Sequence, residues 1–327
     1  MLEMLNPTGG DVIRFAAQVY KVRKQMNAAM KQGQQSAQDL AVKLFCAPPD
    51  AARSLPDLAR LKADSQRFFG WKVAQWQGQE PFVKELLESA EHGDLMHDGL
   101  RVHTYFWKAT STPKRGRILL CHGWEGYALN FALLIQHARA AGFEVHAFDH
   151  LAHGRSQGTQ SGLPIALSTL LAVSKHVSQT AGPLDLLVGH SLGGAAASWA
   201  VAHGEIKPRK LALIAPFYDT HKLSGQWAKA HLLSEEIRGL LQTGLENNSG
   251  KTFADFMPDG LATHYAKHPV PTLIVHDRAD KITSHRHSAT LASKASNVRL
   301  HEAERLGHIA VLADDACMAQ IVRFAQE

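Results

Sequence analysis

The residues G-H-S-L-G at positions 189–193 constrain the fold of this chain more than any other feature. A short apolar run, Leu184 to Val188, precedes them, and a small, alanine-rich run from Gly194 to Ala200 follows. This order predicts a strand, a sharp turn and a helix, with the serine hydroxyl presented at the end of a sheet. The glycines suit such a turn because a Cβ there would collide with the neighbouring strand and helix. Ser191 is therefore the candidate nucleophile.

A serine nucleophile needs a base to take its proton and an acid to orient that base. When the serine lies in a turn of this kind, the partners follow along the chain in the order serine, acid, histidine. Asp277 and Asp280 lie at the end of a predicted buried strand, and His308 lies on a loop after the predicted last strand. The chain thus offers Ser191, Asp280 and His308 at the ends of successive strands.

Acyl transfer also requires a site for the negative oxygen of its tetrahedral intermediate. Two preorganised N–H groups stabilise this oxygen, and the loss of one donor costs about 2.7–4 kcal/mol. We expect one donor to be the backbone N–H of Leu192, directly after the nucleophile. The second should come from the loop that follows the predicted strand at residues 117–121.

Strands and helices alternate through the rest of the chain from Asp94 onward. Before the serine motif we expect strands at 100–106, 118–121 and 145–148 and helices at 130–141 and 165–179. Such alternation predicts a mostly parallel sheet with helices on both faces. Ligands of these sheets bind at the carboxyl ends of the strands, which is where the three candidate residues lie.

With these motifs the chain resembles the α/β-hydrolase fold serine hydrolases of the esterase and lipase kind. It is similar in style to bacterial hydrolases that resemble monoacylglycerol lipases. The resemblance covers the chain from about residue 116 onward, and it is specific for the fold but not for the substrate. The motifs that carry it are H-G-W-E-G at 122–126, D-H-L-A-H-G-R-S at 149–156, G-H-S-L-G-G at 189–194, H-D-R-A-D at 276–280 and G-H at 307–308.

The resemblance assigns further roles in the site. In the family pattern His-Gly-x-x-Gly, the second oxyanion donor maps to the N–H of Trp124, supported by His122 and Gly123. The acid of the family falls where Asp280 lies. Asp277 is a departure, because a small residue is common at its position, and it is an alternative acid. Asp219 is a third option, because some relatives carry the acid on an earlier strand.

His150 and His153 form an H-x-x-H pattern that invites comparison with a metal site. No third ligand at zinc-like spacing lies near them in the sequence. The segment also resembles the loop after the fourth strand of the hydrolases, where histidine and glycine are usual. We therefore expect neither a metal nor another cofactor.

The chain is expected to have a helical N-terminal extension (1–92), a catalytic domain (93–216 and 269–327) and a helical cap insertion (217–268). The resemblance implies that the cap excludes water and shapes the acyl pocket. Candidate pocket residues are Phe217, Tyr218 and Trp227. In the extension, helices are expected from about Val12 to Ala29, from Ser36 to before Pro48 and from Ser54 to near Gly70.

The first of these helices has an apolar stripe with basic residues on the opposite face. Packing on the catalytic domain or on another subunit is favoured, because that is the common fate of such a stripe. Contact with a membrane surface is the alternative.

The composition is that of a soluble enzyme. The chain has 327 residues, of which 45% are hydrophobic and 20% charged, and a net charge of +5. No basic block is interleaved with aromatic residues, so we expect no nucleic-acid partner. No apolar run could span a bilayer, no secretory signal is visible, and the three cysteines are scattered. These features predict a cytoplasmic location.

The sequence thus predicts a serine hydrolase that cleaves small carboxylic esters through an acyl-enzyme intermediate. No cluster of charge lies in the expected cap, which favours a neutral, moderately apolar acyl group. A thioesterase, an amidase or aminopeptidase, and an acyltransferase would use the same residues, and the fold does not decide among them. A non-catalytic binding protein is disfavoured, because it would not need all three of Ser191, Asp280 and His308.

Overall fold

The computed structural model describes residues 9–48 and 80–327. The helix expected from Ser54 to Gly70 lies outside the described residues. The chain divides into two compact units, a smaller one of residues 1–47 and 219–255 and a larger one of residues 48–218 and 256–327. The domain boundaries expected from the sequence remain a prediction.

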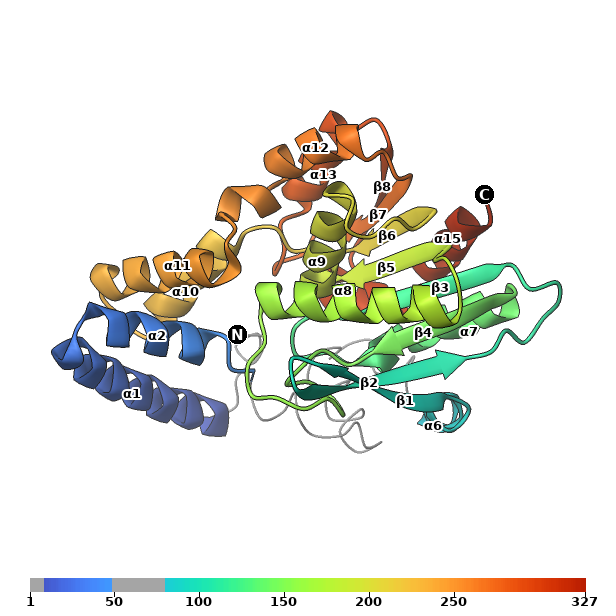
Figure 1. Cartoon of the computed structure of the whole chain (residues 1–327). Coiled ribbons are helices and arrows are strands. Elements are labelled where there is room, and N and C mark those ends of the chain that lie inside the picture. Colours follow the sequence, from blue (N-terminus) through green and yellow to red (C-terminus); the bar gives the residue numbers. More distant parts are fainter. Residues whose placement is uncertain (1–8, 49–79) are drawn as a thin grey trace. The chain divides into compact units, whose positions relative to one another are not determined.

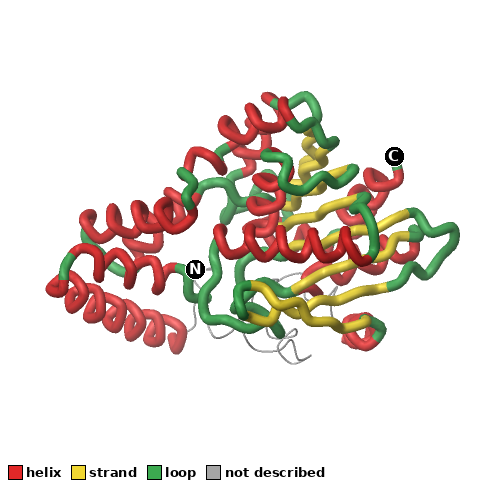
Figure 2. The backbone as a smooth tube through the Cα atoms, in the orientation of Figure 1, coloured by secondary structure: helices red, strands yellow, loops and turns green. Residues whose placement is uncertain are grey.

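The larger unit is built on an eight-stranded sheet with the strand order β1-β2-β4-β3-β5-β6-β7-β8 (Figures 1 and 2). The pairs β1–β2 and β2–β4 are antiparallel, and all other neighbouring strands are parallel. The predicted mostly parallel sheet is confirmed. The strands are β1 (Glu91–His97), β2 (Leu100–Trp107), β3 (Gly116–Cys121), β4 (Phe143–Phe148), β5 (Leu186–His190), β6 (Lys210–Ile214), β7 (Thr272–Asp277) and β8 (Val298–Ala303).

Helices cover both faces of this sheet. Alternate residues of each strand point to opposite faces, so each strand contributes side chains to two cores. On β5, Leu187 belongs to a core formed with α8, α9, α12 and α13, whereas Leu186 and Val188 belong to a core formed with α6, α7 and α15. Strands buried on both faces are nearly continuously apolar, as residues 186–188 of β5 and 211–214 of β6 are. The helices are α6 (Glu80–Glu88), α7 (Ala132–Ala140), α8 (Leu163–Thr180), α9 (Ser191–Ala202), α12 (Pro258–Lys267), α13 (His285–Lys294), α14 (Gly307–Ala310) and α15 (Asp315–Gln326), with short 3₁₀ turns η2 (Ala128–Phe131), η3 (Phe253–Phe256) and η4 (Val311–Ala313).

The smaller unit is a set of helices drawn from two distant parts of the sequence. It contains α1 (Gly9–Gln32), α2 (Gln34–Phe45), α10 (Thr220–Ala230) and α11 (Glu235–Ser249). The apolar stripe of α1 is buried through Val22, Met26 and Ala29, which share a core with α2 and α11. A Cβ at Gly244 of α11 would lie 2.7 Å from Val42 of α2, so glycine permits the close approach of these helices. Among the described residues, no helix is both long and apolar enough to cross a membrane.

Candidate active site

Ser191 lies at the turn between β5 and α9. Its φ is 52°, a region that residues other than glycine rarely adopt, so the backbone is strained there. The turn is tight enough that a Cβ on Gly189 would come within 2.5 Å of the Gly193 carbonyl oxygen. A Cβ on Gly193 would collide with the carbonyl oxygen of Cys121 at the end of β3. The two glycines thus allow the turn to pack directly against the sheet.

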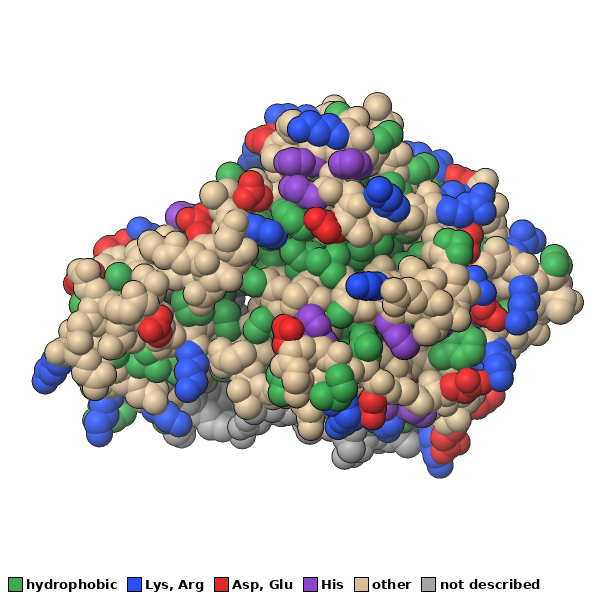
Figure 3. Space-filling view, viewed as in Figure 1, with side chains coloured by type: hydrophobic (Ala, Val, Ile, Leu, Met, Phe, Trp, Pro, Cys, Tyr) green, Lys and Arg blue, Asp and Glu red, His purple; other side chains and the backbone are tan. Residues whose placement is uncertain are grey.

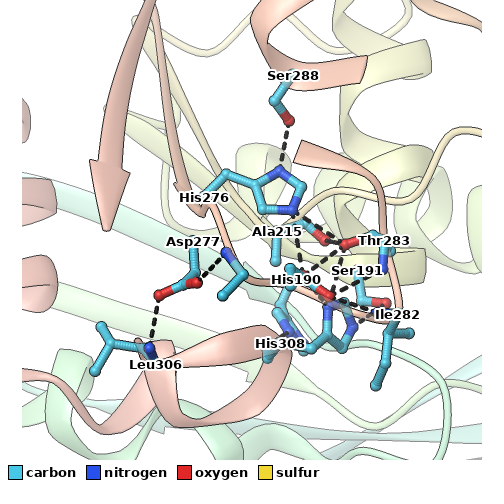
Figure 4. Close-up of polar contacts among 12 residues, drawn as sticks. His190, Ser191, Ala215, His276, Asp277, Ile282, Thr283, Ser288, Leu306 and His308 are labelled. Carbon is cyan, nitrogen blue, oxygen red and sulfur yellow. Dashed lines mark hydrogen bonds and ion pairs between the residues drawn. The ribbon is translucent and has the colours of Figure 1, made fainter. Parts of the chain in front are cut away.

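His308 joins Ser191 to Asp280. Figure 4 shows His308 beside Ser191. It lies in α14, after β8, with its Nε2 atom 2.9 Å from Ser191 Oγ and its Nδ1 atom 2.7 Å from Asp280 Oδ2. Gly307, at a φ of 72°, gives the chain the left-handed bend that precedes this histidine. The structure therefore brings together the three residues that the sequence predicts as a set.

The carboxylate of Asp280 is held by hydrogen bonds on both of its oxygens. Oδ1 accepts the backbone N–H groups of Ile282 and Thr283, at 2.7 and 3.0 Å. Oδ2 accepts from the Thr283 hydroxyl at 2.8 Å and lies 3.2 Å from Nε2 of His276, in addition to His308. Burial by itself would raise the pKa of Asp280, but the hydrogen bonds from His276 and His308 hold this pKa well below its usual range. Asp280 is therefore an ionised acceptor.

The two alternative acids lie in other surroundings. Asp277 accepts the backbone N–H groups of Ala279 and Leu306, both at 2.6 Å, and so ties the end of β7 to the segment before α14. Asp219 caps the N-terminus of α10 by accepting the N–H of Lys222 at 2.8 Å. Each of these carboxylates thus organises backbone, which is a common role for aspartate at loops and helix ends.

His122 braces the loop that follows β3. Its Nδ1 lies 2.7 Å from the Gly123 carbonyl oxygen, and its Nε2 accepts the N–H of His150 at 2.8 Å. A ring that donates from Nδ1 and accepts at Nε2 is neutral. Burial and the neighbouring His150 and His153 rings lower the pKa of His122 well below its usual range, in agreement with this assignment.

This loop also packs on the nucleophile. A Cβ on Gly123 would lie 2.9 Å from the Cβ of Ser191, so the backbone of the loop passes immediately beside it. Trp124 follows in the same turn. Leu192 lies in the first turn of α9, where a backbone N–H has no partner within the helix.

The histidines of the H-x-x-H pattern also contact backbone groups. His150 Nε2 lies 3.0 Å from the carbonyl oxygen of His122, and burial lowers the pKa of His150 to about 3. His153 Nε2 accepts the N–H of Glu125 at 3.1 Å. Across the described ranges, no group of three or more His, Cys, Asp or Glu side chains is arranged to hold a metal ion.

Comparisons with known proteins find similarity to hydrolases in sequence and in fold. Residues 112–251 match the family model described as serine aminopeptidase, S33. The chain is 31% identical over 111 residues to monoacylglycerol lipase of Mycolicibacterium smegmatis, a match that covers 32% of this chain and 39% of that lipase. It is 22% identical over 266 residues to the uncharacterized protein YfhR of Escherichia coli O157:H7, with 79% of this chain and 86% of that protein covered. Among solved structures, Est1E from Butyrivibrio proteoclasticus has a similar fold, with a TM-score of 0.56 and 17% identity over 72% of this chain and 98% of Est1E.

The larger unit has the α/β-hydrolase fold, and the chain is similar to enzymes of the esterase and lipase type. The matched segment of the family model contains Ser191 and the loop after β3, whereas Asp280 and His308 lie beyond it. The assignment of the site residues in this hydrolase therefore rests on the geometry described above.

The three expected pocket residues of the hydrolase lie in different surroundings. Phe217 donates its N–H to the carbonyl oxygen of Ser191 at 3.1 Å, which places it directly beside the nucleophile turn. Tyr218 is 2% exposed and belongs to the core of the larger unit. Trp227 lies in α10 of the smaller unit, where its ring contacts Phe45 at 5.7 Å. A role in substrate binding remains a prediction for all three.

The sequence interpretation missed two histidines of this site. His190 Nε2 lies 3.1 Å from the carbonyl oxygen of His308, with the two rings 4.9 Å apart, and burial lowers the pKa of His190 to about 3. His276 is fully buried at the end of β7 and contacts Asp280. Both occupy motifs that the sequence analysis recognised, His190 as the variable position of the serine motif and His276 as part of a predicted buried strand. The only available signal was a histidine within an otherwise apolar strand.

Proposed function

We propose that this α/β-hydrolase cleaves carboxylic esters through an acyl-enzyme intermediate on Ser191. The observation that carries the proposal is the continuous series of contacts from Ser191 Oγ through His308 to Asp280, with distances of 2.9 and 2.7 Å. A nucleophile within hydrogen-bond distance of a base that is itself oriented by an acid is the arrangement of serine hydrolases.

Asp280 determines which nitrogen of His308 can act as the base. An ionised carboxylate can only accept hydrogen bonds, so the single proton of neutral His308 is on Nδ1, which faces Asp280. Nε2 is then free to take the proton of Ser191 as its oxygen attacks the acyl carbonyl carbon. The same nitrogen donates that proton to the leaving alcohol and later activates the water that releases the acid.

The backbone N–H groups of Trp124 and Leu192 are the proposed oxyanion donors. The support for Leu192 is its place in the first turn of α9, and the support for Trp124 is the packing of its loop against Ser191. His122, bonded within that loop, would keep these donors in place before the reaction begins.

The proposed substrate is a small ester with a neutral, moderately apolar acyl group. On the part of the larger unit that is visible in Figure 3, acidic and basic side chains are interspersed, without a patch of one sign. The similarity to a monoacylglycerol lipase also favours an ester substrate. The proposed pocket residues remain Phe217, Tyr218 and Trp227. The proposed location remains the cytoplasm, because the three cysteines are too few and too scattered for a disulfide framework.

An aminopeptidase is the second candidate, because the matching family model carries that description. The same proton transfers by His308 would then release an amine in place of an alcohol. A thioesterase and an acyltransferase remain further alternatives that use the same residues.

The deciding experiment measures hydrolysis of p-nitrophenyl esters from acetate to palmitate and of aminoacyl p-nitroanilides, for the wild type and Ser191→Ala. We expect ester hydrolysis that is lost in the variant, with a chain-length optimum that reports the size of the acyl pocket. Cleavage of anilides alone would establish the aminopeptidase. Labelling by a fluorophosphonate, which reacts with activated serines, tests the nucleophile without any assumption about the substrate. A wild-type protein that does not label would refute a catalytic Ser191.

A further inference from the structure

A second histidine, His276, also reaches the carboxylate of Asp280. His276 is 0% exposed, with Nε2 at 3.2 Å from Asp280 Oδ2 and Nδ1 at 2.7 Å from the hydroxyl of Ser288 on α13 (Figure 4). The two imidazoles therefore converge on a single carboxylate oxygen, at 3.2 Å for His276 and 2.7 Å for His308.

The protonation of His276 follows from its two partners. Because ionised Asp280 only accepts, Nε2 of His276 must carry a proton. In the neutral ring Nδ1 is then an acceptor, and the Ser288 hydroxyl is the donor that faces it. Ser288 thus fixes the tautomer of His276, as Asp280 fixes that of His308.

Thr283 is a third residue whose side chain contacts Asp280 Oδ2. Its hydroxyl donates to Asp280 Oδ2 at 2.8 Å and lies 3.2 Å from His308 Nδ1 and 3.3 Å from His276 Nε2. Each donor to a carboxylate stabilises its negative charge. The more this charge is shared with His276 and Thr283, the less strongly it holds a proton on His308.

We propose that His276 is a positioning residue that orients Asp280 and sets the acidic limit of activity by sharing the negative charge that faces His308. The inference rests on the proposed function, because it requires His308 to act as the base. His276 itself touches neither the nucleophile nor the expected position of the substrate, and it acts only through Asp280.

Other titratable groups face His276 from three elements. His285 of α13 has its ring 5.6 Å away and is paired with Glu302 of β8 at 2.9 Å, and Glu302 is also the register partner of His276. His190, at the end of β5, interacts with His276 electrostatically. Burial lowers the pKa values of both His285 and His190, so both rings are neutral near pH 7. Asp280 is therefore the charged group that His276 contacts directly.

The test compares His276→Phe with His276→Gln. The phenyl ring fills the site of the imidazole but removes the donor, so the negative charge of Asp280 acts more strongly on His308. We expect kcat to fall about tenfold with little change in KM, because the acid is less well oriented. We expect the acidic limb of the kcat/KM profile to move up by about half a pH unit. The glutamine of His276→Gln can still donate an N–H toward Asp280. This variant should therefore keep most of the wild-type kcat and most of the wild-type position of the acidic limb.

His146→Phe is the matched control. His146 is likewise a histidine within a strand of the sheet, β4, and its Nε2 is buried without a hydrogen-bond partner in the described part of the chain. The same substitution there should leave the pH profile unchanged. A wild-type profile in folded His276→Phe would overturn the proposal, as would a shift of the limb to lower pH.

Ser288→Ala keeps the test decisive if His276→Phe does not fold. Without the Ser288 hydroxyl, His276 loses one of the two contacts that hold its ring and tautomer. The limb should then move in the same direction by a smaller amount, and an unchanged profile would overturn the proposal. The pH dependence of the rate of fluorophosphonate labelling reports the same acidic limb and does not require an ester substrate. Normal labelling with an unshifted limb would refute this inference alone, whereas an unlabelled wild type would refute the proposed function as well.

Discussion

The turn that carries Ser191 and the loop that carries Asp280 hold their side chains by different physical means. In the nucleophile turn (residues 189–193), the backbone is strained at Ser191 and its close packing is possible only because glycines flank it. In the acid loop (residues 277–283), the carboxylate is held by hydrogen bonds from the backbone and from side chains. Steric fit therefore positions the nucleophile, and polar contacts position the acid.

This difference explains why one part of the site was easier to predict than the other. Glycines at fixed spacing around a serine are visible in the sequence, because only glycine fits those positions. The hydrogen bonds that distinguish Asp280 from Asp277 and Asp219 join residues whose spacing follows no fixed pattern. The sequence therefore left three candidate acids, and the geometry separates them through the contact between Asp280 and His308.

The largest expected effect separates the two aspartates of the acid loop. Asp280→Asn should lower kcat/KM by about 10⁴-fold, because an amide can favour the wrong tautomer of His308. Asp277→Asn should lower it by less than about tenfold and reduce stability by about 1–3 kcal/mol, because one backbone N–H loses its acceptor. Hydrolysis of the best p-nitrophenyl ester and unfolding in urea measure the two effects. A greater loss of activity in Asp277→Asn would make Asp277 the acid.

The next effect tests the steric character of the nucleophile turn. Gly193→Ala should destabilise the protein by about 3 kcal/mol, because its Cβ would collide with the carbonyl oxygen of Cys121 in β3. Gly239→Ala is the matched control, since a Cβ there meets nothing within 4 Å in the middle of α11. It should raise stability by up to about 1 kcal/mol, the difference in helix propensity. Equal urea midpoints for the two variants would contradict a steric role for Gly193.

A smaller effect tests the polar character of the acid loop through pH. The pKa of Asp280 is lower in the folded protein than in the unfolded chain, so its contribution to stability is present above about pH 4. This contribution is lost as the pH falls further toward the folded pKa. The free energy of unfolding of the wild type should therefore exceed that of Asp280→Asn at pH 6, by about 2 kcal/mol, and by less at pH 3. A difference that stays constant between these pH values would show that the carboxylate is not stabilised by its donors.

Other features show the same limits of sequence interpretation. The alternation of strands and helices predicted the mostly parallel sheet, because each strand is locally apolar and each helix has its own period. The helices α1 and α2 form one unit with α10 and α11, which lie far away in the sequence. No local sequence pattern could predict this packing. His276 was interpreted as one more residue of a buried strand, because nothing in the sequence shows that its ring faces Asp280.

The packing of α1 and α2 against α11 has a consequence for the synthesis of the protein on the ribosome. The helices α1 and α2 are made before the sheet, whereas the side chains of α11 that complete their core are made only after most of it. These side chains are Ile237, Leu241 and Leu245. At synthesis rates of about 5–20 residues per second, α11 follows α1 after an interval on the order of ten seconds or more. Val22 and Met26 lack their α11 partner for that time. During this interval the apolar side of α1 lacks the partner that buries it in the folded unit, and such transiently exposed surface favours aggregation of a nascent chain.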